Sequence, residues 1–303
     1  MRMVALPSDG DLFPRDQRVR VLLHVIMDVD FRWSRFHLVW VYSATSTQSS
    51  PLQDYFPINN ASCAHEDAPS SLRDQRHMDE SVFNQILDSL VPGAGMTVSM
   101  QGEGEPMLHP RFWAWIDAIK SKGFRAYTIT NGSRIDPDRC ARELVSIGVS
   151  IDTLDPAEAE RIGRHNLPKV LRHVEALLRA MGPDRVVVHT VHYGQALEPL
   201  IADLKSRGLR QHIIQPLQVK DDYARRYPKA PMLQSRIAVR PEITLFRCGF
   251  LDAPRMRYFN IDGIEMPCCF IKDATVYRSA DDLRRTLASK TIPAACSGCR
   301  ELR

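Results

Sequence analysis

The sequence lacks any long hydrophobic run and any dense block of basic residues. Its longest apolar stretches, Val19–Val29 and Phe36–Ala44, are interrupted or too short to reach the ~18 uninterrupted apolar residues that a membrane span requires. The net charge is +4 and the arginines are scattered, which is typical of a solvated surface and not of a nucleic-acid-binding face. Asp9 and Asp11 stand early in a terminus without a small-residue cleavage site, so no signal peptide is predicted. We therefore expect a cytoplasmic protein whose partners include neither a membrane nor a nucleic acid.

Cysteine is scarce in most of the chain and concentrated near its end. Five of the seven cysteines lie after residue 247, and in a reducing compartment such clustering favours metal ligation over disulfide bonds. Cys248 and Cys268 flank Gly263, and two residues separate Cys296 from Cys299, so the thiolates of this close pair can reach one metal centre. Four thiolates suit tetrahedral zinc or a [4Fe–4S] cluster. Spacing alone favours zinc, because structural zinc is common, and disulfides are the third possibility.

From Met78 to about Leu217 the sequence alternates short apolar strands with amphipathic helices. Five strands are predicted, at Met96–Met100, Ala126–Thr130, Val149–Asp152, Arg185–Val191 and His212–Pro216. Six helices are predicted, at Asp79–Leu90, Arg111–Lys122, Asp136–Ser146, Pro156–Ile162, Leu167–Met181 and Leu197–Arg207. Such alternation implies an α/β fold with parallel strands and right-handed crossovers. A sixth strand is needed before the first helix, and Asp54–Asn59 is favoured over Arg18–Met27 because of its distance from that helix.

The pattern changes after Pro216. Val219–Arg240 is polar and indicates a linker. Met256–Met266 alternates apolar and polar residues around Asp262-Gly263, and an Asp-Gly pair between two apolar runs is a strong hairpin signal. A short helix is predicted at Asp281–Ser289.

Three polar motifs follow predicted strands. They are Gly102-Glu103-Gly104-Glu105-Pro106, Thr130-Asn131-Gly132 and Ser150-Ile151-Asp152-Thr153. Glycines let a backbone approach a ligand closely, and carboxylates and carbonyls accept hydrogen bonds from an ammonium group. Taken singly, each motif is equally well explained by loop closure or helix capping. The carboxyl ends of the strands in a barrel-type α/β fold carry its chemistry, so we expect the three motifs to meet there.

At these spacings the motifs resemble the core of the radical S-adenosylmethionine (SAM) superfamily, and the resemblance covers roughly residues 55–303. It implies that the amino group of SAM is held by the first motif, namely Gly102, Glu103, Gly104, Glu105 and Pro106. It also implies that Asn131 shapes the rim near the ligand, and that Ser150 and Asp152 contact the ribose or methionine part of SAM. His189 and Gln215 end later strands at the same rim, and we expect His189 to be a core histidine.

The late cysteines resemble a shortened SPASM domain, often called a twitch domain. That module follows many radical SAM cores and binds one auxiliary [4Fe–4S] cluster. With the core motifs upstream, an iron–sulfur cluster is preferred over zinc as the group that Cys248, Cys268, Cys296 and Cys299 hold. Cys269 is adjacent to Cys268 and could replace it as a ligand.

One part of the family pattern is missing. Radical SAM enzymes use Cys-x3-Cys-x2-Cys to bind a first [4Fe–4S] cluster, whereas the polar segment 45–76 contains only Cys63. Asp67 and Ser70 occupy the other two positions, and oxygen is a poor substitute for thiolate on iron–sulfur clusters. Cys63 is therefore interpreted as a remnant of the motif. The chain is a degenerate member that binds SAM, a peptide or a partner, or it holds an unusual cluster, or this segment is mistranslated.

These inferences combine into one prediction of architecture and function. We expect a partial (βα)6 TIM-type barrel at 55–220, preceded by an extension at 1–54 and followed by a linker and a small iron–sulfur domain at 221–303. The resemblance implies SAM and an auxiliary [4Fe–4S] cluster as cofactors, with a second [4Fe–4S] cluster in question. The expected activity is radical oxidation, dehydrogenation or crosslinking of a peptide or small metabolite, with a reductant protein as partner. The alternative is a catalytically degenerate binding protein.

Overall fold

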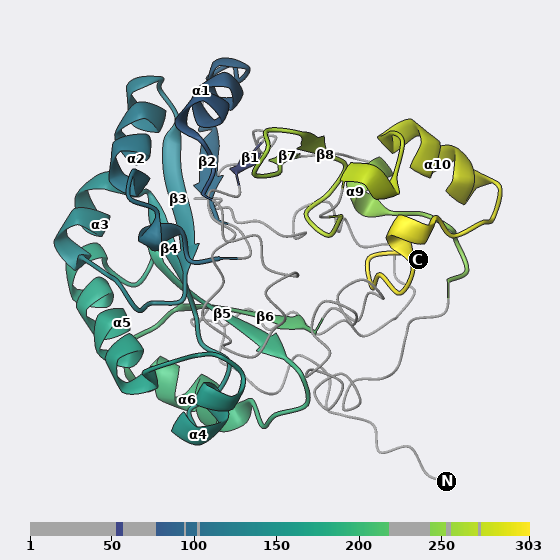
Figure 1. The fold of residues 1–303 in the computed structure, drawn as a ribbon. Helices are drawn as coiled ribbons and strands as arrows, with labels where there is room; N and C mark the ends of the chain where they lie inside the picture. The colour runs from purple at the N-terminus through teal and green to yellow at the C-terminus, as the bar shows by residue number, and fades with distance from the viewer. Residues whose placement is uncertain are drawn as a thin grey trace, which may run out of the picture.

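The computed structural model describes residues 53–56, 77–93, 95–101, 104–217, 243–252, 256–271 and 274–303. Its central element is a sheet of eight strands in the order β6-β5-β4-β3-β2-β1-β7-β8. Neighbouring strands from β6 to β7 run parallel, and β8 alone is antiparallel to its neighbour. The sheet curves, and helices α1 to α6 lie on its convex side (Figure 1).

The elements have the following bounds. The strands are β1 Gln53–Phe56, β2 Thr97–Met100, β3 Arg125–Thr130, β4 Ser146–Ser150, β5 Val186–His192, β6 Gln211–Pro216, β7 Met256–Phe259 and β8 Glu265–Met266. The helices are α1 Glu80–Asp88, α2 Phe112–Ser121, α3 Pro137–Glu143, α4 Pro156–Arg161, α5 Leu167–Met181, α6 Glu198–Ser206, α9 Gly249–Asp252 and α10 Ala280–Ala288. Short 3-10 turns, η2 Pro106–Leu108, η3 Ala274–Val276 and η4 Ala294–Cys296, complete the set. None of the described helices is long and apolar enough to cross a membrane.

The predicted α/β alternation with parallel strands is confirmed. The sixth strand is β1, as favoured for Asp54–Asn59, and it pairs in parallel with β2. The competing segment Arg18–Met27 lies outside the described residues, as does the predicted linker Val219–Arg240. The polar pattern 45–76 is described only at β1.

One boundary between a helix and a strand was predicted wrongly. The helix expected at Asp136–Ser146 ends at Glu143, and the strand expected at Val149–Asp152 occupies Ser146–Ser150 instead. The reason is tertiary: the amides of Val145 and Ile147 donate hydrogen bonds to carbonyls of the neighbouring strand region, Ala126 and Arg185. Pairing on both sides outweighs the helical preference of this short segment.

The main core lies between the convex face of the sheet and the helices. Helix α5 repeats apolar residues at helical spacing and buries Val170, Val174 and Leu177 in the same cluster as the fully buried Ile147 and Val149 of β4. Each such side chain contributes about 1.5–3 kcal/mol when it is removed from water. Because successive side chains of a strand point to opposite faces of the sheet, the residues that alternate with these buried ones point to the concave face.

A second apolar cluster lies in the C-terminal part of the described chain. It contains Cys248, Phe250, Leu283 and Cys296, and it meets the first cluster at strand β7. Within that strand Tyr258 belongs to the second cluster and Phe259 to the first. Because β7 also pairs with β1, the region expected to form a separate domain continues the sheet of the barrel.

The hairpin predicted at Met256–Met266 is confirmed. Strands β7 and β8 pair antiparallel, and the turn contains Gly263 at φ +78°. The side-chain oxygen of Asn260 accepts hydrogen bonds from the amides of Asp262 and Ile264 at 3.0 and 2.8 Å, which closes the turn. The chain then runs directly from β8 into Cys268.

Candidate functional site

The carboxylate of Glu105 joins the loop after β2 to the loop after β3. It accepts hydrogen bonds from the Thr130 hydroxyl at 2.6 Å, the Asn131 amide at 2.6 Å and the Met107 amide at 3.1 Å. The residue is only 1% exposed, and this burial raises the pKa of the carboxyl, while the three donors and Arg164 lower it by less. Glu105 is therefore turned into the protein as a brace between two loops of the rim.

The rest of the first motif is only partly described. Gly104 is partly exposed, and Pro106 is buried and starts η2, the turn that Glu105 caps by accepting from Met107. Gly102 and Glu103 lie outside the described residues. In the described part of the motif, the backbone at Gly104 is therefore partly exposed, whereas the Glu105 side chain is buried.

The Asn131-Gly132 turn is closely packed from below. Gly132 has φ +78°, and a Cβ atom there would lie 2.7 Å from Val170 Cγ1 and 3.0 Å from Val149 Cγ1. Its carbonyl oxygen lies 2.6 Å from His173 Nδ1, and its amide donates to the Thr130 hydroxyl at 3.1 Å. Only glycine fits this position, and the packing fixes the partly exposed Asn131 beside the rim.

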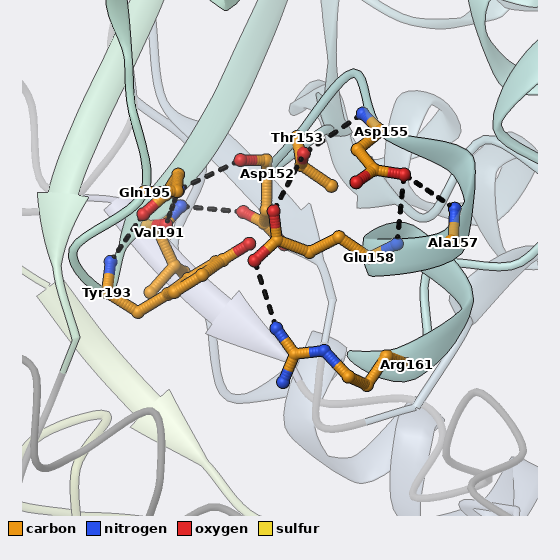
Figure 2. A network of polar contacts seen from close by, with 9 residues as sticks. All are labelled: Asp152, Thr153, Asp155, Ala157, Glu158, Arg161, Val191, Tyr193 and Gln195. Atoms are coloured by element: carbon orange, nitrogen blue, oxygen red, sulfur yellow. Dashed lines mark hydrogen bonds and ion pairs between the residues drawn. The ribbon is translucent and has the colours of Figure 1, made fainter.

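Asp152 links the ends of β4 and β5. Its two carboxylate oxygens accept from Arg164 Nε at 2.6 Å and from the Val191 amide at 2.7 Å, and the residue is 4% exposed. The side-chain amide of Gln195 donates to the carbonyls of Asp152 and Val191 at 2.9 and 2.8 Å (Figure 2). Asp152 is thus committed to internal contacts, whereas Ser150, two residues earlier, is partly exposed.

The same network extends into the start of α4. Asp155 caps the helix by accepting from the amides of Ala157 and Glu158, and Glu158 pairs with Arg161 at 3.0 Å. The ring of Tyr193 extends from the loop after β5 toward Glu158 (Figure 2). Burial and the neighbouring Glu158 raise the pKa of this phenol, so it stays protonated at neutral pH. Arg164, Gln195 and Tyr193 had not been predicted, because no local pattern marks partners that the fold brings from up to 43 residues away.

The structure places His189 and Gln215 on the concave face. Both are partly exposed, and His189 Nε2 lies 3.4 Å from the hydroxyl of Tyr127 on β3. Burial deep in the barrel lowers the pKa of His189 well below its usual value, with a smaller contribution from His212. His189 is therefore a neutral imidazole that lines the concave wall, partly exposed and with the Tyr127 hydroxyl as a neighbour.

The four predicted metal-ligating cysteines line one small cavity in the C-terminal part. Its wall contains Cys248, Cys268, Cys296 and Cys299 together with apolar side chains and Glu301. Two features bring them together: the turn in which the Cys299 amide donates to the Cys296 carbonyl, and the bridge that pairs Cys248 with Leu302. Cys269 is more exposed than Cys268 and is not part of this wall.

The cavity is an environment in which free thiols stay protonated. Burial raises the pKa of Cys248 to about 11 and raises that of Cys299 further. Among the described residues, no three histidine, cysteine or acidic side chains stand close enough to hold a metal ion as they are placed here. The thiols surround a space and do not meet at a point.

Comparison with known proteins finds matches in the central part of the chain. Residues 59–206 match the sequence model of the Radical SAM superfamily. A 121-residue stretch is 27% identical to an S-adenosylmethionine-dependent nucleotide dehydratase of Selenomonas ruminantium, and it covers 36% of this chain and 44% of that protein. A 102-residue stretch is 32% identical to the mycofactocin maturase MftC of Mycobacterium ulcerans (strain Agy99), and it covers 33% of this chain and 27% of that protein. The matched stretches thus span less than half the length of either relative.

The fold is also that of a solved structure. Streptococcus suis SuiB superposes with a TM-score of 0.52 at 11% identity, over 78% of this chain and 65% of SuiB. SuiB bound to S-adenosylmethionine gives a TM-score of 0.50 at 12% identity, over 81% of this chain and 67% of that one. At this level of identity the similarity concerns the fold alone.

Proposed function

We propose that the chain is an S-adenosylmethionine-dependent iron–sulfur protein that modifies its substrate by radical chemistry. The observation that carries the proposal is the match of residues 59–206 to the Radical SAM superfamily model, in a fold whose parallel strands bring the predicted SAM-binding motifs to their carboxyl ends. Ligands of barrel-type α/β folds bind at that edge of the sheet. The Glu105 brace and the Asp152 network hold the loops of this rim in a defined arrangement.

Within the rim we propose two kinds of residue. Asn131, Ser150 and the backbone at Gly104 are partly exposed and are proposed to contact SAM directly. Glu105 and Asp152 are buried and bonded to neighbouring loops, and are proposed as positioning residues. On one-electron reduction, bound SAM would supply the 5′-deoxyadenosyl radical that abstracts hydrogen from a substrate.

We further propose that the cysteine cavity binds an auxiliary [4Fe–4S] cluster of the SPASM or twitch type. Four thiols around one apolar-walled space suit a cluster that takes four thiolate ligands. The position of Cys268 in the wall supports it over Cys269 as the ligand.

For the substrate we propose a peptide, with a small metabolite as the alternative. A solved structure of SuiB holds a precursor peptide, SuiA, and has a TM-score of 0.50 with this chain, whereas one sequence relative is a nucleotide dehydratase. The proposed reaction is an oxidation, dehydrogenation or crosslinking, with a reductant protein as the electron donor. We propose the cytoplasm as location, because a reducing compartment keeps cysteine thiols reduced and able to bind iron.

A second function is favoured by one specific feature of the sequence. Cys63, Asp67 and Ser70 stand where the family has three cysteines, and all three lie outside the described residues. A chain without the radical-generating cluster would bind SAM, a peptide or a partner without cleaving SAM. The two functions share the rim and the cysteine cavity and differ only in this loop.

Metal counting and SAM cleavage on one anaerobically purified sample separate the two functions. An active enzyme yields 5′-deoxyadenosine from SAM with a reductant and contains about eight irons per chain, because it holds two clusters. About four irons with no 5′-deoxyadenosine would identify the degenerate binding protein. Zinc in place of iron and sulfide would contradict the cluster assignment for Cys248, Cys268, Cys296 and Cys299. A Cys63→Ala variant of the same sample reports whether that thiol holds iron.

A further inference from the structure

A tyrosine and a histidine meet on the concave face of the sheet across an intervening strand. Tyr127 on β3 and His189 on β5 flank β4, and the Tyr127 hydroxyl lies 3.4 Å from His189 Nε2. In the strand register Tyr127 is level with Ser146 and His189 with Ser150, so the two side chains converge diagonally from opposite ends of β4.

The contact depends on a glycine between the two side chains. A Cβ atom built at Gly148 would lie 2.5 Å from the Tyr127 hydroxyl oxygen and 2.8 Å from His189 Cδ2. Any other residue at this position would occupy the space in which the two polar groups meet. Gly148 is not among the described glycines with a positive φ. Glycine is therefore needed here because a side chain would not fit, and not because of the backbone conformation.

The pair has two polar neighbours on the same face. Ser99 is the register partner of Tyr127 on β2, and Ser150 is the register partner of His189 on β4, so all four side chains share one side of the sheet. Ser99 is 5% exposed, and its hydroxyl has no hydrogen-bond partner within the described chain. We call Ser99, Tyr127 and His189 the inner-wall patch; Ser150, which is proposed above to contact SAM, borders it.

The patch is polar and uncharged at neutral pH. His189 is held neutral by its depth in the barrel, yet part of its surface stays exposed. The serine hydroxyl, the phenol and the neutral imidazole of the patch can each donate and accept hydrogen bonds. Phosphates and carboxylates are recognised best by guanidinium and ammonium groups, whereas an amide or hydroxyl is matched by uncharged donors and acceptors.

We propose that the inner-wall patch is a substrate-binding site for an uncharged hydrogen-bonding group of the peptide-amide type, and that Tyr127 and His189 determine its specificity. The inference rests on the proposed function for the existence of a substrate, and it names the chemistry that this substrate presents to the wall. It favours a peptide over a nucleotide, whose phosphates this patch would not hold. Gly148 is the positioning residue that lets the pair form.

The test uses small probes on the full chain purified anaerobically. Diethyl pyrocarbonate modifies neutral imidazoles, and fragment mass spectrometry reports its rate at His189 and at His192, which lies on the same strand and faces the opposite side. N-methylacetamide at ~0.3 M should slow modification of His189 about fourfold, as expected of a five-heavy-atom ligand with a Kd of ~0.1 M. Methyl phosphate at the same concentration should slow it less than about 1.5-fold by the same relation. His192 should respond to neither probe.

Variants of the contact sharpen the result. Tyr127→Phe removes the hydroxyl and keeps the ring, and Gly148→Ala keeps both groups but fills the space between them. Both should reduce the protection of His189 by N-methylacetamide to below about twofold, which is the effect of losing one hydrogen bond. Circular dichroism decides which variants are folded, and the two-probe comparison on the unmodified protein stands without them.

The inference is overturned if methyl phosphate protects His189 better than N-methylacetamide, if neither probe protects it, or if His192 is protected equally. SAM cleavage by the same unmodified sample tests the proposed function separately. Protection of His189 without SAM cleavage would support the binding site and contradict the radical activity. SAM cleavage without protection would support the radical activity and contradict the binding site.

Discussion

The clearest measurable consequence of this structure concerns His212, a buried histidine on strand β6, which pairs with β5. It is 3% exposed, and its Nε2 lies 2.8 Å from the hydroxyl oxygen of Thr190. That hydroxyl donates its proton to the carbonyl of Ile151, so it accepts from His212 and Nε2 carries the proton. The other nitrogen, Nδ1, has no hydrogen-bond partner in the described part of the chain.

Protonation of His212 would therefore place a charge on a buried nitrogen without an acceptor. Burial lowers the pKa of His212 from 6.5 to about 4, and the carboxylate of Asp152 offsets this only in part. Because the folded-state pKa lies below the unfolded one, the stabilisation is complete above about pH 6.5 and is lost as the pH falls toward 4. Linkage gives a loss of about 2 kcal/mol between pH 7 and pH 5, and about 3 kcal/mol by pH 4.

Replacing His212 by glutamine tests this reasoning. The glutamine amide can still donate to Thr190 but does not titrate, so His212→Gln should remove about 2 kcal/mol of the acid-induced loss between pH 7 and pH 5. Urea unfolding at both pH values, followed by circular dichroism, gives the free energy of unfolding of each protein. The same protocol on His192→Gln serves as the control, because that histidine is partly exposed.

The expected result is that the free energy of unfolding changes less with pH in His212→Gln than in the wild type. A difference in stability at one pH alone is not the test. His212→Gln is expected to be less stable than the wild type at pH 7 and to close that gap at pH 5. His189 also titrates below its usual range and contributes its own loss to both proteins, so it cancels in the comparison. Parallel pH profiles for the wild type and the variant would refute the assignment of a buried neutral His212.

Three further predictions concern single substitutions, two of them paired with a control variant. Cys296→Ala should lower iron content and destabilise the C-terminal part, whereas Cys269→Ala should leave iron content unchanged; equal metal content in both variants would contradict the proposed ligand set. Gly132→Ala should destabilise by about 2 kcal/mol more than Gly182→Ala in thermal or urea unfolding, because both have positive φ but only Gly132 meets Val170 at 2.7 Å. Glu105→Ala should lower the free energy of unfolding by about 3 kcal/mol, since three donors lose their acceptor, and a change below about 1 kcal/mol would show that water replaces the carboxylate.

Local sequence was a reliable guide where a periodic pattern ended at a clear stop signal. Helix α5 was predicted at Leu167–Met181, as observed, because its apolar face repeats at helical spacing and Gly182 ends it. The helix predicted at Asp136–Ser146 extended too far, since the same apolar residues satisfy a helix or a strand until neighbouring strands are present. Boundaries of this kind depend on pairing partners that lie far away in the sequence.

Local sequence could not show which groups of the rim remain available to a ligand. Glu105 and Asp152 were predicted to contact SAM, and in the structure each is bonded to Thr130, Arg164 or a backbone amide supplied by another loop. The motifs that contain Glu105 and Asp152 do not indicate these partners, because the partners come from other segments of the chain. The exposed candidates, such as Ser150, can be told from the buried ones only after the strands are assembled.

By itself the sequence determined the alternation of strands and helices, the polar motifs after them, and the number and spacing of the late cysteines. These features are local, since hydrophobic periodicity, turn residues and short spacings are written in consecutive residues. The tertiary structure alone decided that Cys268 and not Cys269 lines the cysteine cavity, and that Tyr127 meets His189 over Gly148. Both outcomes depend on the direction in which side chains leave their strands, which is set only when the sheet closes around them.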